Sequence, residues 1–128
     1  MTLGELNALS GRVIGCAIEV HRILGPGLLE SSYQAALLYE LRAHGMHAER
    51  EVPVPLVYKG VELDTSFRAD IIVENELVVE LKSTEKDNPL YAKQLMTYLR
   101  ILNRRLGLLI NFNREKLADG VERVIAGW

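Results

Sequence analysis

The chain has 128 residues, 48% of them hydrophobic and 25% charged, so it can build a packed core and is not a disordered or low-complexity chain. The formal net charge of −2 excludes a protein that coats nucleic acid through a broad basic field, so any contact with nucleic acid must be local. We expect one domain spanning residues 1–128. The lone cysteine, the absence of a secretion signal at the start and the lack of an apolar run of about 20 residues predict a cytoplasmic protein without a membrane span.

Two helices are predicted at the start of the chain. Apolar residues recur at helical spacing over residues 7–23, and Gly25-Pro26-Gly27 then stops the helix. A second helix is predicted over residues 28–44, with Leu37 and Leu41 on its core side and Gly45 at the position where a left-handed residue commonly ends a helix.

Three antiparallel strands are predicted next. From residue 49 apolar and other residues alternate with period two, and Pro53 and Pro55 suit an edge strand. Lys59-Gly60 turns the chain into a longer strand over residues 61–73. Residues 74–76 make a tight connection, and residues 77–82 return antiparallel, which completes a three-stranded meander.

A crossover helix and a further strand complete the expected order. Asn88-Pro89 is a typical helix start, and Tyr91, Leu95 and Tyr98 mark its core stripe. Residues 106–112 are nearly all apolar, as in a strand covered on both faces, so we expect a right-handed crossover and parallel pairing with residues 77–82. A last short strand is expected near residues 121–125. The predicted fold class is α/β (α+β) with a mixed central sheet.

The meander predicts a cluster of charged side chains. If the turn centres on Asn75, Asp70 lies opposite Glu80, and Lys82 shares their face two residues further on. The opposite face is uniformly apolar, which supports this register. Its members are Ala69, Ile71, Val73, Leu77, Val79 and Leu81.

Two carboxylates facing each other across a strand pair need a cation. At about 4 Å and an effective dielectric near 20 their repulsion is about 4 kcal/mol, a large fraction of the stability of a small domain. Lys82 can offset part of this repulsion. A divalent ion, Mg²⁺ or Mn²⁺, held by carboxylate oxygens and a backbone carbonyl offsets more of it, and it activates water for phosphodiester hydrolysis. The alternative is a plain surface pairing of Glu with Lys, which is common on strands.

The sequence resembles the GxxExxY proteins, a branch of the PD-(D/E)XK nuclease superfamily, from about residue 13 to residue 125. Gly27, Glu30 and Tyr33 match the residues that name the family, within a matching string over residues 20–33. Further matching strings cover residues 68–74, 78–82, 94–99 and 106–112. The resemblance implies a restriction-endonuclease-like core.

The resemblance also implies site residues. Asp70, Glu80 and the backbone carbonyl of Leu81 are the implied metal ligands, Lys82 is the implied catalytic lysine, and Glu30 matches a helical glutamate that often completes the metal site. Gln94, with Tyr98 four residues later, resembles the additional motif of RecB-like nucleases and is expected near the site. Ala69 stands where the superfamily name has proline.

Other polar residues have two interpretations each. Tyr33 and Tyr98 lie on apolar stripes, so they either line the site or belong to the core. His21 is either a structural histidine or a site residue beside the glycine turn. Arg68 alternates onto the face of Asp70, where it either contacts the scissile phosphate or balances the acidic cluster.

The sequence therefore supports two functions. The first is a Mg²⁺- or Mn²⁺-dependent nuclease that hydrolyses DNA or RNA. The alternative is a catalytically silent binding or regulatory module that keeps the nuclease fold and acts through a homodimer or a partner protein, which the acidic balance favours. A glycosidase is disfavoured, because only 6% of the residues are aromatic and a sugar cleft needs aromatic walls.

Overall fold

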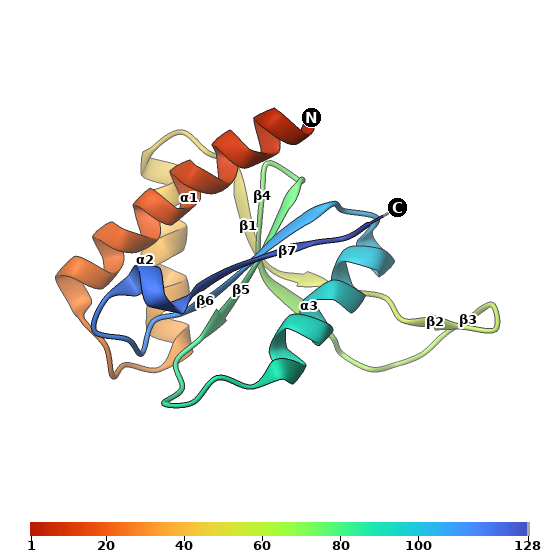
Figure 1. The fold of residues 1–128 in the computed structure, drawn as a ribbon. Coiled ribbons are helices and arrows are strands. Elements are labelled where there is room, and N and C mark those ends of the chain that lie inside the picture. Colours follow the sequence, from red (N-terminus) through yellow and green to blue (C-terminus); the bar gives the residue numbers. More distant parts are fainter. Residues whose placement is uncertain (128) are drawn as a thin grey trace.

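The computed structural model describes residues 1–127, which form three α-helices, one short 3-10 helix and seven strands (Figure 1). The helices are α1 (Leu3–Leu24), α2 (Glu30–Ala43), α3 (Pro89–Leu102) and the 3-10 helix η1 (Leu117–Gly120). The strands are β1 (Ala48–Pro53), β2 (Val57–Tyr58), β3 (Val61–Glu62), β4 (Arg68–Val73), β5 (Leu77–Lys82), β6 (Leu106–Asn111) and β7 (Val121–Ile125).

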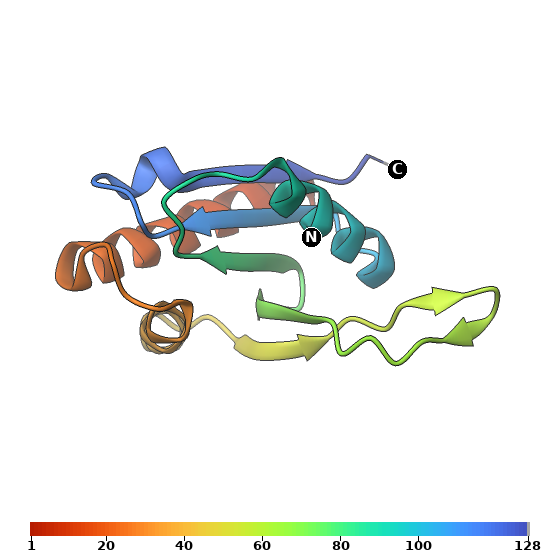
Figure 2. The same cartoon turned by 90° about the horizontal axis from the view of Figure 1, so that it is seen from below.

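A mixed five-stranded sheet in the order β1-β4-β5-β6-β7 forms the centre of the protein. The pairs β1–β4 and β4–β5 are antiparallel, β5–β6 is parallel, and β7 closes the edge antiparallel to β6. One core cluster joins α1 and α2 to one face of the sheet, and a second joins α3 to the other face (Figures 1 and 2). The predicted α/β class, the meander, the crossover helix and the parallel strand are all confirmed.

The helix ends follow from local chemistry. Thr2 and Glu5 form a reciprocal capping box at the start of α1, and Gly25, at φ 69°, supplies the left-handed residue that ends it. Asn88 caps α3 by accepting the N–H of Leu90, as expected from the Asn-Pro start. Among residues 1–127, none of the helices has the length and apolar character needed to cross a membrane.

The long strand expected over residues 61–73 is wrong. The chain instead forms a small β2–β3 hairpin, leaves regular structure, and enters the central sheet only at Arg68 (Figures 1 and 2). At the end of this excursion the Phe67 ring lies 6.0 Å from the Tyr98 ring of α3, measured between centroids. Period-two alternation continued through the segment and therefore concealed the interruption.

The apolar face expected on β4 and β5 is largely observed. Ile71, Val79 and Leu81 pack in the cluster beneath α1 and α2, together with Val73 and Leu77. Ala69 is a correction, because it is buried in the opposite cluster with α3. Ile72 and Val78 are also buried on the α3 side, so both faces of the β4–β5 pair are covered.

Candidate active site

The β4–β5 register brings Asp70 and Glu80 to the same level of the sheet. Ile72 pairs with Val78 and Ile71 with Val79, so the next step along both strands places Asp70 opposite Glu80, as predicted. The turn that sets this register contains Glu74 at φ 54°. Both acids therefore lie near the carboxyl end of β5, at the amino end of β4.

The two carboxylates replace the backbone ladder at this point. The Asp70 N–H donates to Glu80 Oε1 at 3.1 Å, and the Leu81 N–H donates to Asp70 Oδ2 at 2.7 Å. Each side chain thus satisfies the backbone of the facing strand. Carboxylate oxygens lie between β4 and β5 where strand hydrogen bonds would otherwise continue.

Burial makes this pair electrostatically costly. Glu80 is only 5% exposed, and its burial, followed by the negative charge of Asp70, raises its pKa to about 9. Burial also raises the pKa of Asp70, and the charge of Glu51 adds to it, whereas the Leu81 N–H and the Lys82 charge act in the opposite direction. Around neutral pH the pair therefore retains a proton unless a cation replaces it.

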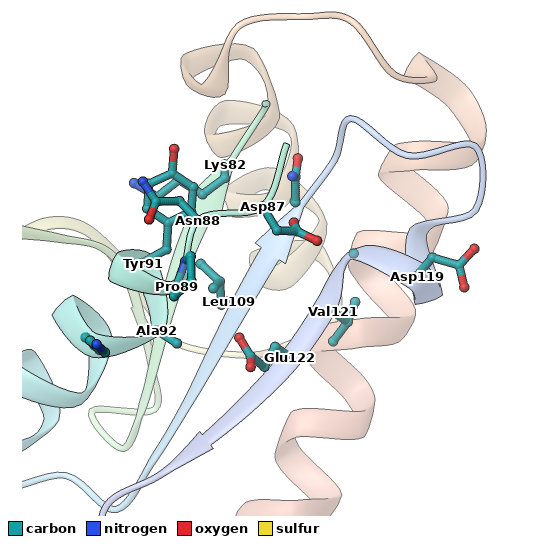
Figure 3. Close-up of a pocket in the computed structure, with 13 residues that line it drawn as sticks. Lys82, Asp87, Asn88, Pro89, Tyr91, Ala92, Leu109, Asp119, Val121 and Glu122 are labelled. Atoms are coloured by element: carbon teal, nitrogen blue, oxygen red, sulfur yellow. The ribbon is translucent and has the colours of Figure 1, made fainter. Parts of the chain in front are cut away.

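Lys82 does not bridge the two acids. Its Nζ lies 4.4 Å from the centroid of the Tyr91 ring of α3, and no ion pair within residues 1–127 includes it. Lys82 and Tyr91 both line a cleft of about 740 Å³ between the start of α3, the end of β6 and the start of β7 (Figure 3). The lysine expected to neutralise the pair is therefore directed toward an open cleft.

Glu30 makes no ion pair or hydrogen bond with either acid within the described residues. It is the exposed first residue of α2, and Gln34, one turn later on the same helix face, donates to the Asp70 carbonyl at 3.0 Å and to Glu51 Oε1 at 2.8 Å. This face of α2 is thus the one that meets β4 at Asp70. Within residues 1–127, no three His, Cys, Asp or Glu side chains form a group arranged to hold a metal ion.

The donor chemistry of the pair nevertheless fits a hard divalent cation. Each carboxylate uses one oxygen on a backbone N–H, which leaves the other oxygen of Asp70 and Glu80 for a proton or an ion. The N–H of Leu81 points toward β4, and the carbonyl of a strand residue points to the same side as its N–H. An all-oxygen set of this kind suits Mg²⁺ or Mn²⁺.

The residues that match Gly-x-x-Glu-x-x-Tyr build the loop before Glu30. Tyr33 is fully buried, its hydroxyl donates to the Gly25 carbonyl and accepts the Leu28 N–H, and its ring stacks 4.4 Å from that of Phe112. Ser83, directly after Lys82, donates to the Leu28 carbonyl. Tyr33 thus fixes the turn that leads into Glu30 and contacts the core.

The other residues predicted from the sequence differ in their proximity to the pair. Tyr98 is buried, and its pKa is raised by burial first and then by the charges of Glu80 and Asp70, so it lies in their field. Arg68 donates to the Glu51 carbonyl at 3.4 Å. Gln94 is exposed, and no hydrogen bond of its side chain is found within the described chain.

His21 and two residues that the sequence analysis missed hold the loop after Lys82. The Nε2 atom of His21 lies 2.7 Å from the Arg114 carbonyl, and Arg114 donates to the Thr84 carbonyl and pairs with Asp87. Buried Asn111 accepts the Thr84 N–H at 3.2 Å and donates to its carbonyl at 3.0 Å. A polar residue ending an apolar strand was the available signal, because a buried amide needs partners.

Comparison with known proteins identifies the family of the chain. A model of the PD-(D/E)XK nuclease superfamily matches residues 7–124. Among solved structures, an alkaline exonuclease (LHK-Exo) from Laribacter hongkongensis is similar at 15% sequence identity and a TM-score of 0.44, with 87% of this chain and 76% of that chain covered. None of the curated proteins compared with the chain matches it. The match over nearly the whole chain shows that this protein belongs to the PD-(D/E)XK nuclease superfamily.

Proposed function

We propose that the protein is a metal-dependent nuclease that hydrolyses phosphodiester bonds of DNA or RNA. The observation that carries this proposal is the buried Asp70–Glu80 pair, whose oxygens occupy the gap between β4 and β5. A buried acidic pair costs stability unless something relieves it, and a divalent ion is the partner that its all-oxygen donor set fits. Membership of a nuclease superfamily supports the same reading.

In this proposal Asp70, Glu80 and the Leu81 carbonyl hold Mg²⁺ or Mn²⁺, and Glu30 completes the set. Support for Glu30 comes from its helix face, which meets β4 through Gln34. Because Glu30 is exposed and begins a helix, its side chain is free to change rotamer toward the pair.

Lys82 is the residue that acts on substrate in this proposal. A Mg²⁺ or Mn²⁺ ion bound at the acidic pair would polarise a phosphate oxygen as a Lewis acid and lower the pKa of a bound water. Lys82 contributes a positive charge at the cleft, where it stabilises negative charge that develops on the phosphate. Tyr98 is buried within the electrostatic field of the acidic pair, and Arg68 and Gln94 lie on exposed surface where a nucleic-acid strand can reach them.

We further propose that the chain belongs to the GxxExxY branch of the superfamily. Gly27 and Tyr33 support this, since both shape the loop that leads into Glu30. Gly27 has a φ of 98°, which favours glycine, and Tyr33 fastens the loop that ends at Glu30.

The test is cleavage of labelled single- and double-stranded DNA and RNA with Mg²⁺ or Mn²⁺, with and without EDTA. We expect cleavage by the unmodified protein and a loss of about 10²-fold or more in Glu80→Gln and Lys82→Met. Lys59→Met is the matched control, because Lys59 is exposed in the β2–β3 hairpin. Equal cleavage by all four proteins, or none by the unmodified protein with metal bound, would contradict the proposal.

The alternative, a silent module acting through a homodimer or partner protein, is favoured by one feature. Val57, Tyr58 and Val61 of the projecting β2–β3 hairpin are each more than half exposed, an apolar surface typical of protein contacts (Figure 2). An inert unmodified protein whose apparent mass falls when Tyr58 and Val61 are replaced by serine would favour this alternative. A monomer with metal-dependent cleavage would exclude it.

A further inference from the structure

Lys82 is held by an aromatic ring in this structure. It ends β5, its side chain is half-buried, and its Nζ lies 4.4 Å from the centroid of the Tyr91 ring. An ammonium at this distance from a ring face is attracted by the negative face of the π system. No carboxylate within residues 1–127 lies within ion-pair distance of it, so the acidic pair acts on Lys82 only at longer range and the ring is its direct contact.

The Tyr91 ring is itself fixed by the fold. Asn88 and Pro89 begin α3, and the Tyr91 N–H donates to the Asn88 carbonyl at 3.0 Å, so the residue sits in the first turn of a capped helix. The ring packs against the core cluster beneath α3. Its hydroxyl makes no hydrogen bond within the described residues, so the ring face is the part of the side chain that matters for Lys82.

The contact determines where the ammonium points. Glu80 and Lys82 are two residues apart on one strand, so a free lysine chain could fold back toward the acidic pair. Tyr91 holds it on the side of the cleft, whose other walls come from Leu109 of β6 and Glu122 of β7 (Figure 3). The carboxylate oxygens stay available for a cation, and the ammonium faces the cleft that would receive a nucleic-acid strand.

We propose that Tyr91 is a positioning residue that holds the Lys82 ammonium at the mouth of this cleft, ready to meet a phosphate group of a bound nucleic-acid strand. The proposal deepens the proposed nuclease function and rests on it for the identity of the substrate. It assigns no chemistry to Tyr91 itself, because the effect passes through Lys82. It requires an aromatic ring at position 91, but it does not require the hydroxyl group of that ring.

The first test measures the contact between Lys82 and Tyr91 directly and does not depend on nuclease activity. In the unmodified protein the ring current of Tyr91 should shift the NMR signals of the Lys82 Hε protons upfield, with the assignment made by their loss in Lys82→Arg. Tyr91→Phe should keep this shift and Tyr91→Leu should abolish it. Unshifted Lys82 signals in the unmodified protein, or identical signals in Tyr91→Leu, would overturn the proposal whether or not the protein cuts nucleic acid.

The second test uses the substrate identified by the cleavage panel. Since a cation–π contact is a modest interaction, Tyr91→Leu should lower kcat by between about 3-fold and 30-fold, and Tyr91→Phe should restore it. KM should change less, because the ring does not touch the substrate. A Tyr91→Leu protein with unchanged kcat, or a Tyr91→Phe protein as slow as Tyr91→Leu, would overturn the positioning role while leaving the nuclease proposal intact.

Discussion

Metal binding at the acidic pair should depend steeply on pH. Burial and the charge of Asp70 raise the pKa of Glu80 to about 9, so at neutral pH the metal-free pair holds a proton that an ion must displace. Between pH 6 and pH 8 the population of the ionised pair rises about tenfold per unit. The apparent affinity for Mn²⁺ should therefore increase by about 100-fold across this range.

Isothermal titration calorimetry with Mn²⁺ at pH 6, 7 and 8 measures this directly. Repeating each titration in two buffers of different ionisation enthalpy counts the protons released, and we expect about one per ion at pH 7. In Glu80→Gln the steep pH dependence should flatten, even though the remaining affinity is weaker. Equal affinity at pH 6 and pH 8, or no released proton, would refute the claim that the two buried carboxylates share a proton and bind the ion.

Three further predictions concern stability. Glu80→Gln should stabilise the metal-free protein at pH 8 and change its stability little at pH 4. The reason is that the raised native pKa of Glu80 favours folding below the unfolded value of 4.5, and this contribution is lost as the pH rises toward 9. Urea unfolding at both pH values tests this, and an equal stabilisation at both would contradict it. Tyr33→Phe should lower the free energy of unfolding by about 1–3 kcal/mol, because the Gly25 carbonyl and the Leu28 N–H lose their hydrogen-bond partner. The control Tyr39→Phe, at a residue that is 72% exposed, should change it by no more than about 0.5 kcal/mol. Equal effects of the two variants in urea unfolding would argue against the role of Tyr33 in holding the loop. Gly120→Ala should lower the free energy of unfolding by about 1–3 kcal/mol or more, since the added Cβ would lie 2.2 Å from the Asn111 carbonyl oxygen. Gly15→Ala, at an open position in the middle of α1, should raise it by about 0.5–1 kcal/mol. A Gly120→Ala protein as stable as the original in thermal unfolding would disprove the close approach.

Local rules accounted for the sheet around the site. The distance of Asp70 and Glu80 from the turn at Asn75 gave their register, because the turn is short and antiparallel pairing counts outward from it. The apolar run before Asn111 likewise indicated a buried parallel strand. In both cases the information lies within a few residues of the element itself.

The parts that could not be predicted depend on contacts between distant segments. The strand expected over residues 61–73 is interrupted before Arg68, where Phe67 meets Tyr98 of α3, about 30 residues later, and no local pattern encodes that contact. Lys82 was expected to neutralise the acids, but its partner is Tyr91, whose position depends on how α3 crosses the sheet. Gln34 was missed for the same reason, since its partner Asp70 lies on another element.

The acidic pair is not explained by folding alone. Two apolar residues at positions 70 and 80 would let the β4–β5 ladder continue and would remove the burial penalty that raises the pKa of Glu80. The surrounding sheet, with Ile71, Val79 and Leu81 buried beneath two helices, supplies the apolar packing that offsets this penalty. A proton relieves this penalty at and below neutral pH, and a divalent cation bound between the carboxylates would relieve it at higher pH as well. The energetic cost of the buried pair therefore supports the proposal that these two carboxylates bind a metal ion.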